Sequence, residues 1–79
     1  MNLTVAQKVK IRAIELGLNQ TEIAKEASRR LGTKITLQRL NDGIHGRRPN
    51  EWYRMHITVA EILGLHPSEI RNAQPQVAP

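Results

Sequence analysis

Four glycines limit how long any regular element of this chain can be. Gly17, Gly32, Gly46 and Gly64 each follow a run in which apolar residues recur three or four positions apart. That period is helical, and glycine favours the left-handed conformation that ends a helix. A chain of 79 residues has room for one domain at most. The spacing therefore predicts a compact all-α fold of five short helices.

The first predicted helix begins after Thr4, which has the spacing of a capping box with Gln7, and it ends at Gly17. Its apolar stripe comprises Val5, Val9, Ala13 and Leu16. Ile11 and Ile14 lie off this stripe. We expect them either to pack against the C-terminal region or to belong to an interface with a second subunit.

The second predicted helix runs from about Gln20 to Leu31, because Asn19 and Glu22 repeat the cap signature and Gly32 follows. Its apolar stripe comprises Ile23, Ala24, Ala27 and Leu31. The two alanines on this stripe are small, so they predict the close approach of another helix.

The third predicted helix begins after Thr33 or Thr36, which are alternative N-caps, and ends at Gly46. Its apolar residues are Leu37, Leu40 and Ile44. Its exposed side carries Gln38, Arg39, Asp42 and His45, with Asn41 on the flank. Gln, Arg and Asn are the side chains that form paired hydrogen bonds with the edges of nucleic-acid bases.

Two further helices complete the predicted domain, which spans residues 1–71. Asn50 is expected to cap the fourth helix, which ends at Gly64, and Pro67 starts a short fifth one. The apolar face of the fourth helix comprises Trp52, Met55, Val59, Ile62 and Leu63. Residues 72–79 offer little to bury and predict a disordered tail.

The net charge of +5 is concentrated in the middle of the chain. Residues 25–54 contain eight basic and three acidic residues, whereas the remainder is neutral. Such a region predicts either a binding face for a polyanion, most often nucleic acid, or a solubilising surface. The chain has no cysteine, and nothing in it resembles a signal peptide or an apolar run long enough to cross a membrane. We therefore expect a cytoplasmic protein without a membrane partner.

Three segments resemble the lambda repressor and Cro-like (XRE-type) family of helix-turn-helix DNA-binding proteins. LNQTEIAKEAS at residues 18–28 resembles the first helix of the motif, and LNDGIHGRRP at 40–49 resembles the end of the recognition helix. VAEILGLHPSEI at 59–70 is similar to the last two helices of the family. The resemblance covers roughly residues 5–70. It implies a lambda-repressor-like DNA-binding domain.

The sequence departs from the family pattern at the centre of the motif. Family members usually have a glycine where this chain has Ser28, so we expect the second helix to be one turn longer. The register of the third helix then has two alternatives. If Leu37 and Leu40 are its core residues, the base-reading positions include Lys34, Gln38 and Arg39. If Leu40 leads the core, which we favour, these positions are Gln38, Arg39, Asn41 and Asp42.

The resemblance implies that the third helix lies in the major groove of double-stranded DNA. Arg39 would contact guanine, Gln38 adenine or a phosphate, and Asn41 a neighbouring base. Asp42 would accept from cytosine or pair with Arg39, three residues away. The expected phosphate contacts are Gln20, Lys34, Thr36, Arg47, Arg48 and Asn50. Gly43 would allow close approach either of the fourth helix or of DNA.

The implied function is transcriptional regulation, most simply by a small repressor of phage or mobile-element type in the bacterial cytoplasm, at the nucleoid. A single module contacts few base pairs, so we expect a homodimer on a palindromic operator. We expect its interface mainly on the fourth and fifth helices, with Ile11, Ile14 and Trp52 as further candidates. Glu22 and Glu26 are expected either to be ordinary solvated residues or to contact RNA polymerase. No residue constellation predicts an enzyme, a metal site or a cofactor. The alternatives are an antitoxin with a toxin partner, or a protein-interaction module that does not bind DNA.

Overall fold

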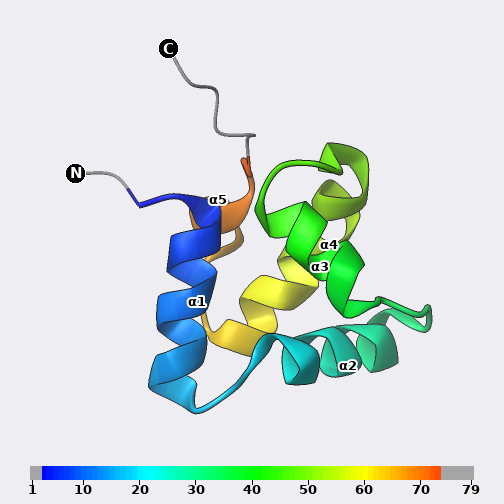
Figure 1. Cartoon of the computed structure of the whole chain (residues 1–79), viewed down its shortest axis with the longest axis horizontal. Coiled ribbons are helices and arrows are strands. Elements are labelled where there is room, and N and C mark those ends of the chain that lie inside the picture. Colours follow the sequence, from blue (N-terminus) through cyan, green and yellow to red (C-terminus); the bar gives the residue numbers. More distant parts are fainter. Residues whose placement is uncertain (1–2, 74–79) are drawn as a thin grey trace.

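The computed structural model describes residues 3–73, and all regular structure within them is helical (Figure 1). The five helices are α1 (Val5–Leu16), α2 (Gln20–Leu31), α3 (Leu37–Ile44), α4 (Pro49–Leu63) and α5 (Pro67–Ile70). The predicted all-α class and the order of five helices are therefore confirmed for this part of the chain.

Most helix ends follow the cap residues in the sequence. Capping boxes begin three of the helices, and their residue pairs are Thr4 and Gln7, Asn19 and Glu22, and His66 and Glu69. Left-handed glycines end three helices, namely Gly17 (φ 72°), Gly32 (φ 68°) and Gly64 (φ 68°). These local interactions satisfy backbone groups that a helix end leaves unpaired, so they fix where each helix begins and ends.

α4 is the central helix and contacts the other four. In Figure 1, α1 stands on one side of it, α2 runs along the lower edge and α3 lies in front. Two side chains bind the ends of α4 to its neighbours. Arg12 Nε donates to the carbonyl oxygen of Leu63 at 2.7 Å, and Trp52 Nε1 donates to that of Ile70, also at 2.7 Å.

Trp52 is the largest side chain of the core and is only 1% exposed. Its ring lies against Gly43 of α3, where a β-carbon would come within 2.8 Å of Trp52 Cε3. Gly43 therefore serves the close approach of α4, one of its two predicted roles. The prediction of Trp52 as a dimer-interface residue is wrong, because its surface is already buried within a single chain.

The predicted apolar stripes are correct in the middle of the helices and wrong at some of their ends. Leu16, Leu31 and Leu37 are exposed, and each is a terminal residue of its helix. Several residues outside the predicted core are buried as well, among them Ile35 before α3 and His56 in α4.

The start of α4 also differs from the prediction. Asn50 does not cap this helix, because α4 begins two residues earlier than an Asn50 cap would place it, with Pro49 as its first residue and Arg48 at the N-cap position. Proline suits the first helical position, where its missing N–H would have no partner in any case. Arg48 forms no side-chain cap bond.

The predicted tail lies mostly outside the described residues. Of residues 72–79, the structure describes Asn72, which is exposed, and Ala73, which is buried. Residues 74–79 lie beyond this limit, so the predicted disorder there stays a prediction.

Candidate functional site

α3 has an inner side that packs on the core and an outer side that faces solvent. Leu40, Gly43 and Ile44 are buried on the inner side. The outer side, which we define as Leu37, Gln38 and Asn41, is exposed or partly exposed. A single helix thus presents an amide-bearing surface on a rigid apolar support.

The burial of α3 distinguishes between the two registers considered for this helix. Leu40 is its first buried residue, whereas Leu37 is 46% exposed. The register in which Leu40 leads the core is therefore the observed one. Its candidate base-reading positions are Gln38, Arg39, Asn41 and Asp42.

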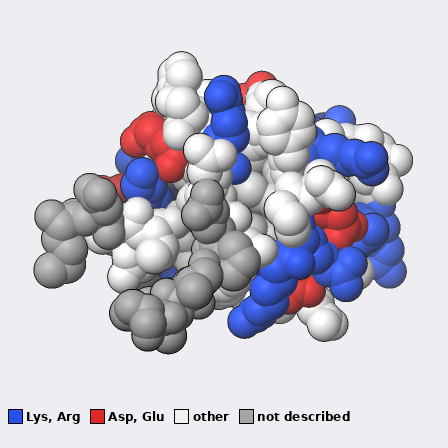
Figure 2. Space-filling model, turned by 90° about the horizontal axis from the view of Figure 1, so that it is seen from above, with Lys and Arg blue, Asp and Glu red and all other residues white. Residues whose placement is uncertain are grey.

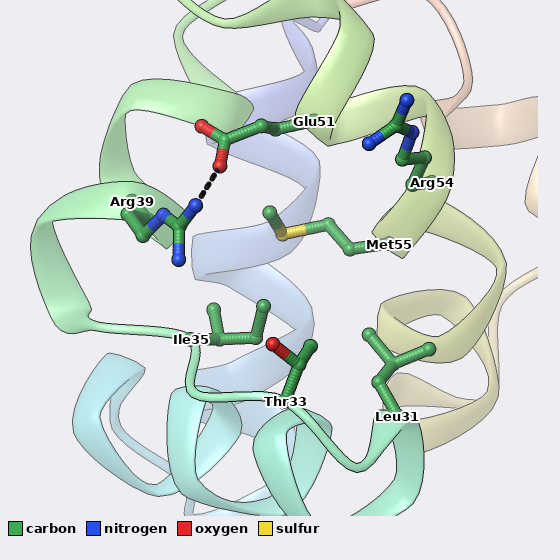
Figure 3. Close-up of a pocket in the computed structure, with 7 residues that line it drawn as sticks. All are labelled: Leu31, Thr33, Ile35, Arg39, Glu51, Arg54 and Met55. Carbon is green, nitrogen blue, oxygen red and sulfur yellow. Dashed lines mark ion pairs between the residues drawn. The ribbon is translucent and has the colours of Figure 1, made fainter.

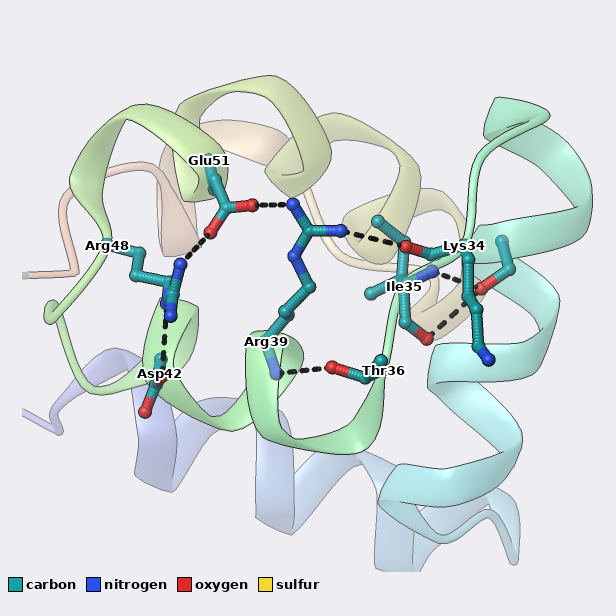
Figure 4. Close-up of polar contacts among 8 residues, drawn as sticks. Lys34, Ile35, Thr36, Arg39, Asp42, Arg48 and Glu51 are labelled. Carbon is teal, nitrogen blue, oxygen red and sulfur yellow. Dashed lines mark hydrogen bonds and ion pairs between the residues drawn. The ribbon is translucent and has the colours of Figure 1, made fainter.

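Ser28 fixes the connection between α2 and α3. Its Oγ donates to the carbonyl oxygen of Ala24 at 2.7 Å and accepts from the backbone N–H of Ile35 at 2.7 Å. The Ile35 side chain is buried directly before the N-cap Thr36, whose Oγ1 accepts from the Arg39 N–H at 3.1 Å. Figure 4 shows this approach to the helix. The start of α3 is therefore anchored by both burial and hydrogen bonds.

Arginines and carboxylates connect the two ends of α3 to α4. We call this set the junction network; its members are Arg39, Asp42, Arg47, Arg48 and Glu51. Arg39 Nη2 lies 2.5 Å from Glu51 Oε1, and Arg39 Nη1 donates to the Lys34 carbonyl oxygen at 3.1 Å. Arg48 joins the two carboxylates, at 3.1 Å from Asp42 Oδ2 and 3.1 Å from Glu51 Oε2 (Figure 4).

The arginines keep both carboxylates of the junction network ionised. Hydrogen bonds from Arg48 and Arg47 hold the pKa of Asp42 below its usual value, against the opposing effect of burial. Burial raises the pKa of Glu51, but hydrogen bonds from Arg48 and Arg39 outweigh it and lower the pKa. Two negative charges therefore offset most of the charge of three arginines.

The expected pair between Asp42 and Arg39 is not formed. Asp42 Oδ1 lies 3.2 Å from Arg47 Nη1, and its other oxygen faces Arg48. Arg39 instead points toward α4, where Glu51 is its partner (Figure 3). The alternative partner lay on another helix, so spacing along α3 could not reveal it.

Four of the six predicted phosphate-contacting residues lie beyond the two ends of α3. Lys34 and Thr36 precede the helix, and Arg47 and Arg48 follow it. Lys34, Arg47 and Arg48 are exposed. The outer side of α3 thus lies, along the chain, between two pairs of these residues.

Other predicted residues lie elsewhere. Gln20 is the first residue of α2 and is partly buried. Asn50 lines a groove with Arg71 and Asn72, beside α5. Ile14 on α1 is 78% exposed, so it does not pack against the C-terminal region. Ile11 is also exposed, but it lines a shallow groove with Leu65 of that region.

Two basic residues that sequence reasoning did not single out lie near the ends of α3. Lys10 of α1 lines a groove with His45, whose pKa is lowered by burial and by the charges of Arg47 and Lys10. Arg54 of α4 lines a groove with Arg39. Lys10 lies far from α3 in the sequence. Arg54 belongs to the basic middle of the chain, but no spacing in the sequence connects it with α3.

Basic side chains gather toward one side of the molecule in Figure 2, with acidic side chains between them. This distribution agrees with the basic middle of the sequence. Glu26 is one of the three acidic residues in that part of the sequence. Hydrogen bonds from Arg29 and Arg30 lower the pKa of Glu26 to about 2.

Searches for other kinds of site and for relatives yield nothing further. Among residues 3–73, no helix is long and apolar enough to cross a membrane, and no group of His, Cys, Asp and Glu side chains is arranged to hold a metal ion. Comparison of the chain with protein-family models, curated proteins and solved structures finds no match in any of the three.

Proposed function

We propose that this chain is a sequence-specific double-stranded DNA-binding regulator of the lambda repressor-like, XRE-type class. In this proposal α2 and α3 form a helix-turn-helix, and α3 enters the major groove. The observation that carries the proposal is the outer side of α3. Its exposed amides lie between basic residues, and its inner side is fixed on the core.

Gln38 and Asn41 are the proposed base-reading residues. Their amides provide both a donor and an acceptor, as paired hydrogen bonds with adenine require. They lie one helical turn apart on the same side of α3, so both can face one groove. The exposed side chain of Leu37 beside them suits contact with a thymine methyl group.

Lys34 and Arg47 are the proposed phosphate contacts at the two ends of α3. Contacts with phosphates fix the orientation of a protein on the duplex without reading its sequence. Lys34 makes no ion pair within residues 3–73, whereas Arg47 shares Asp42 with Arg48. Binding of phosphate by Arg47 would exchange one anionic partner for another.

Arg39 has a second role that competes with base reading. Its guanidinium is held by Glu51 and by the Lys34 carbonyl oxygen, so it would have to leave them to reach guanine. Removal of the Glu51 charge tests this exchange. If Arg39 reads a base, Glu51→Gln should tighten binding to the selected site. The same substitution should have no such effect in a chain that also carries Arg39→Ala.

Exposed isoleucines on α1 support the proposed homodimer and also favour a protein partner as a second candidate function. Ile14 and Ile11 remain uncovered within a single chain, and apolar groups of this size are typically buried when a partner binds. A dimer would place two α3 helices on half-sites about 34 to 36 Å apart. A toxin bound at the same surface would instead indicate an antitoxin.

Selection of bound duplexes from a random pool tests the main proposal. We expect one enriched motif with two-fold symmetry. Gln38→Ala should then cost about 1 to 3 kcal/mol on that motif and almost nothing on a scrambled duplex. Arg47→Ala should weaken both duplexes alike and lower the slope of log K against log salt by about 1. Failure to enrich any motif at moderate salt would contradict the proposal.

A further inference from the structure

A groove behind the start of α3 is lined by none of the four residues proposed above as base or phosphate contacts, namely Gln38, Asn41, Lys34 and Arg47. It has a volume of about 230 Å³ and lies between the end of α2, the connection to α3 and the first half of α4. Its lining residues are Leu31, Thr33, Ile35, Arg39, Glu51, Arg54 and Met55 (Figure 3).

The floor of this groove is apolar. Ile35 and Met55 are buried in it, and Leu31 beside them is 38% exposed although it belongs to the apolar stripe of α2. The fold leaves Leu31 partly uncovered because α2 ends there. An apolar side chain placed on this floor would remove exposed carbon surface from water, which stabilises a complex by roughly 25 cal/mol per Å².

The rim of the groove is cationic. Arg54 makes no ion pair with any residue between positions 3 and 73, whereas Arg39 is held by Glu51. Glu51 is itself at the rim, but its two carboxylate oxygens face Arg39 and Arg48. The unneutralised charge at the rim is therefore that of Arg54, and it favours an anionic occupant.

The size of the groove indicates what kind of occupant it suits. Sites that enclose a small molecule usually have volumes of about 300 to 1,000 Å³, so this groove is small and fits one side chain of a larger partner. A DNA backbone could contact Arg54 but has no apolar side chain for the floor. We propose that the groove binds an acidic segment of a partner protein, with one apolar side chain on the Leu31, Ile35 and Met55 floor and a carboxylate on Arg54.

An NMR titration of the full chain with a blocked peptide, EELEE, tests this proposal without DNA, so its outcome does not depend on the proposed function. We expect saturable shifts of the Thr33 and Ile35 amides. Arg54→Ala should weaken binding by about two- to five-fold, as for an exposed ion pair. The peptide EESEE, which lacks the leucine, should bind about ten-fold more weakly or not at all.

Arg71→Ala is the matched control, because Arg71 is also exposed, makes no ion pair within residues 3–73 and lines a different groove. Equal losses for Arg54→Ala and Arg71→Ala would indicate attraction by net charge alone and overturn the proposal. Equal binding of EELEE and EESEE would overturn it too, since the apolar floor would then be unused. Leu31→Ser offers a second route, because Leu31 is exposed enough to be replaced without unfolding the chain. This substitution should weaken the binding of EELEE more than the binding of EESEE.

Discussion

The inner and outer sides of α3 differ in how closely the rest of the chain contacts them. On the inner side, Gly43 allows the Trp52 ring to come so close that no β-carbon fits between them. On the outer side, Gln38 is exposed and has no fixed partner within residues 3–73. The first side determines where the helix lies, and the second determines what it can touch. Changes to the two sides should therefore be separable, with stability affected by one and binding by the other.

Gly43→Ala should have the largest effect on stability. The added β-carbon would lie 2.8 Å from a ring carbon of the buried Trp52. Overpacking of this kind costs about 1 to 3 kcal/mol, of which the better helix propensity of alanine returns only about 0.5 to 1. Urea unfolding should thus show a net loss of up to about 2.5 kcal/mol.

Asn41→Ala on the outer side is the control for this change. It should alter the unfolding free energy by less than about 0.5 kcal/mol, as surface substitutions usually do. If the two variants were equally stable, the assignment of inner and outer sides would be wrong.

Ser28→Ala should have the next largest effect, because it removes the link between α2 and α3. The Ile35 N–H would lose its acceptor, and a partly buried unpaired donor costs about 1 to 2 kcal/mol. Hydrogen exchange at the Ile35 amide should accelerate together with the drop in unfolding free energy. Unchanged exchange at this amide would show that the serine is dispensable.

Thr36→Ala should cost about 1 kcal/mol through loss of the N-cap of α3. Thr33→Ala is the matched control, since Thr33 is exposed and does not cap the helix. Thermal unfolding measures both losses. A larger loss of stability for Thr33→Ala than for Thr36→Ala would show that Thr33, and not Thr36, caps α3.

The smallest expected effect is the acid sensitivity of the junction network. In the folded chain, chiefly the hydrogen bond from Arg48 lowers the pKa of Asp42 below its ordinary value of 3.8. Its contribution to stability is therefore complete above pH 3.8 and is lost as pH falls through the folded pKa. Asp42→Asn should be less stable than the wild type near neutral pH, and the difference should shrink below pH 3.8. A pH-independent difference would mean that the carboxylate charge contributes nothing.

Sequence patterns predicted the features of this fold that depend on local interactions. Capping boxes at Thr4 and Asn19 and the glycines after α1 and α2 act within a few residues, so their consequences could be read directly. The helix order followed from them. The start of α4 was misplaced at Asn50 because a proline at the first position competes with an asparagine cap, and spacing alone does not rank the two.

The features that depend on distant parts of the chain could not be read in this way. Arg39 has a possible partner three residues away, but α4 brings Glu51 closer. His56 is polar and yet buried in α4, with Nδ1 paired to the Tyr53 carbonyl oxygen. Lys10 reaches the end of α3 only because α1 packs beside it. For the candidate site, the sequence thus located α3, but it did not show which charged side chains of α3 have ion-pair partners on other helices.

The position of α3 is connected to that of α5 through a side chain of α4. Trp52 lies against Gly43 with its ring and is bonded to the Ile70 carbonyl oxygen through its indole nitrogen. Loosening of α5 would thus be felt at α3 through one aromatic side chain. Because Trp52 is the sole tryptophan of the chain, its fluorescence emission gives a built-in optical readout of that mechanical connection.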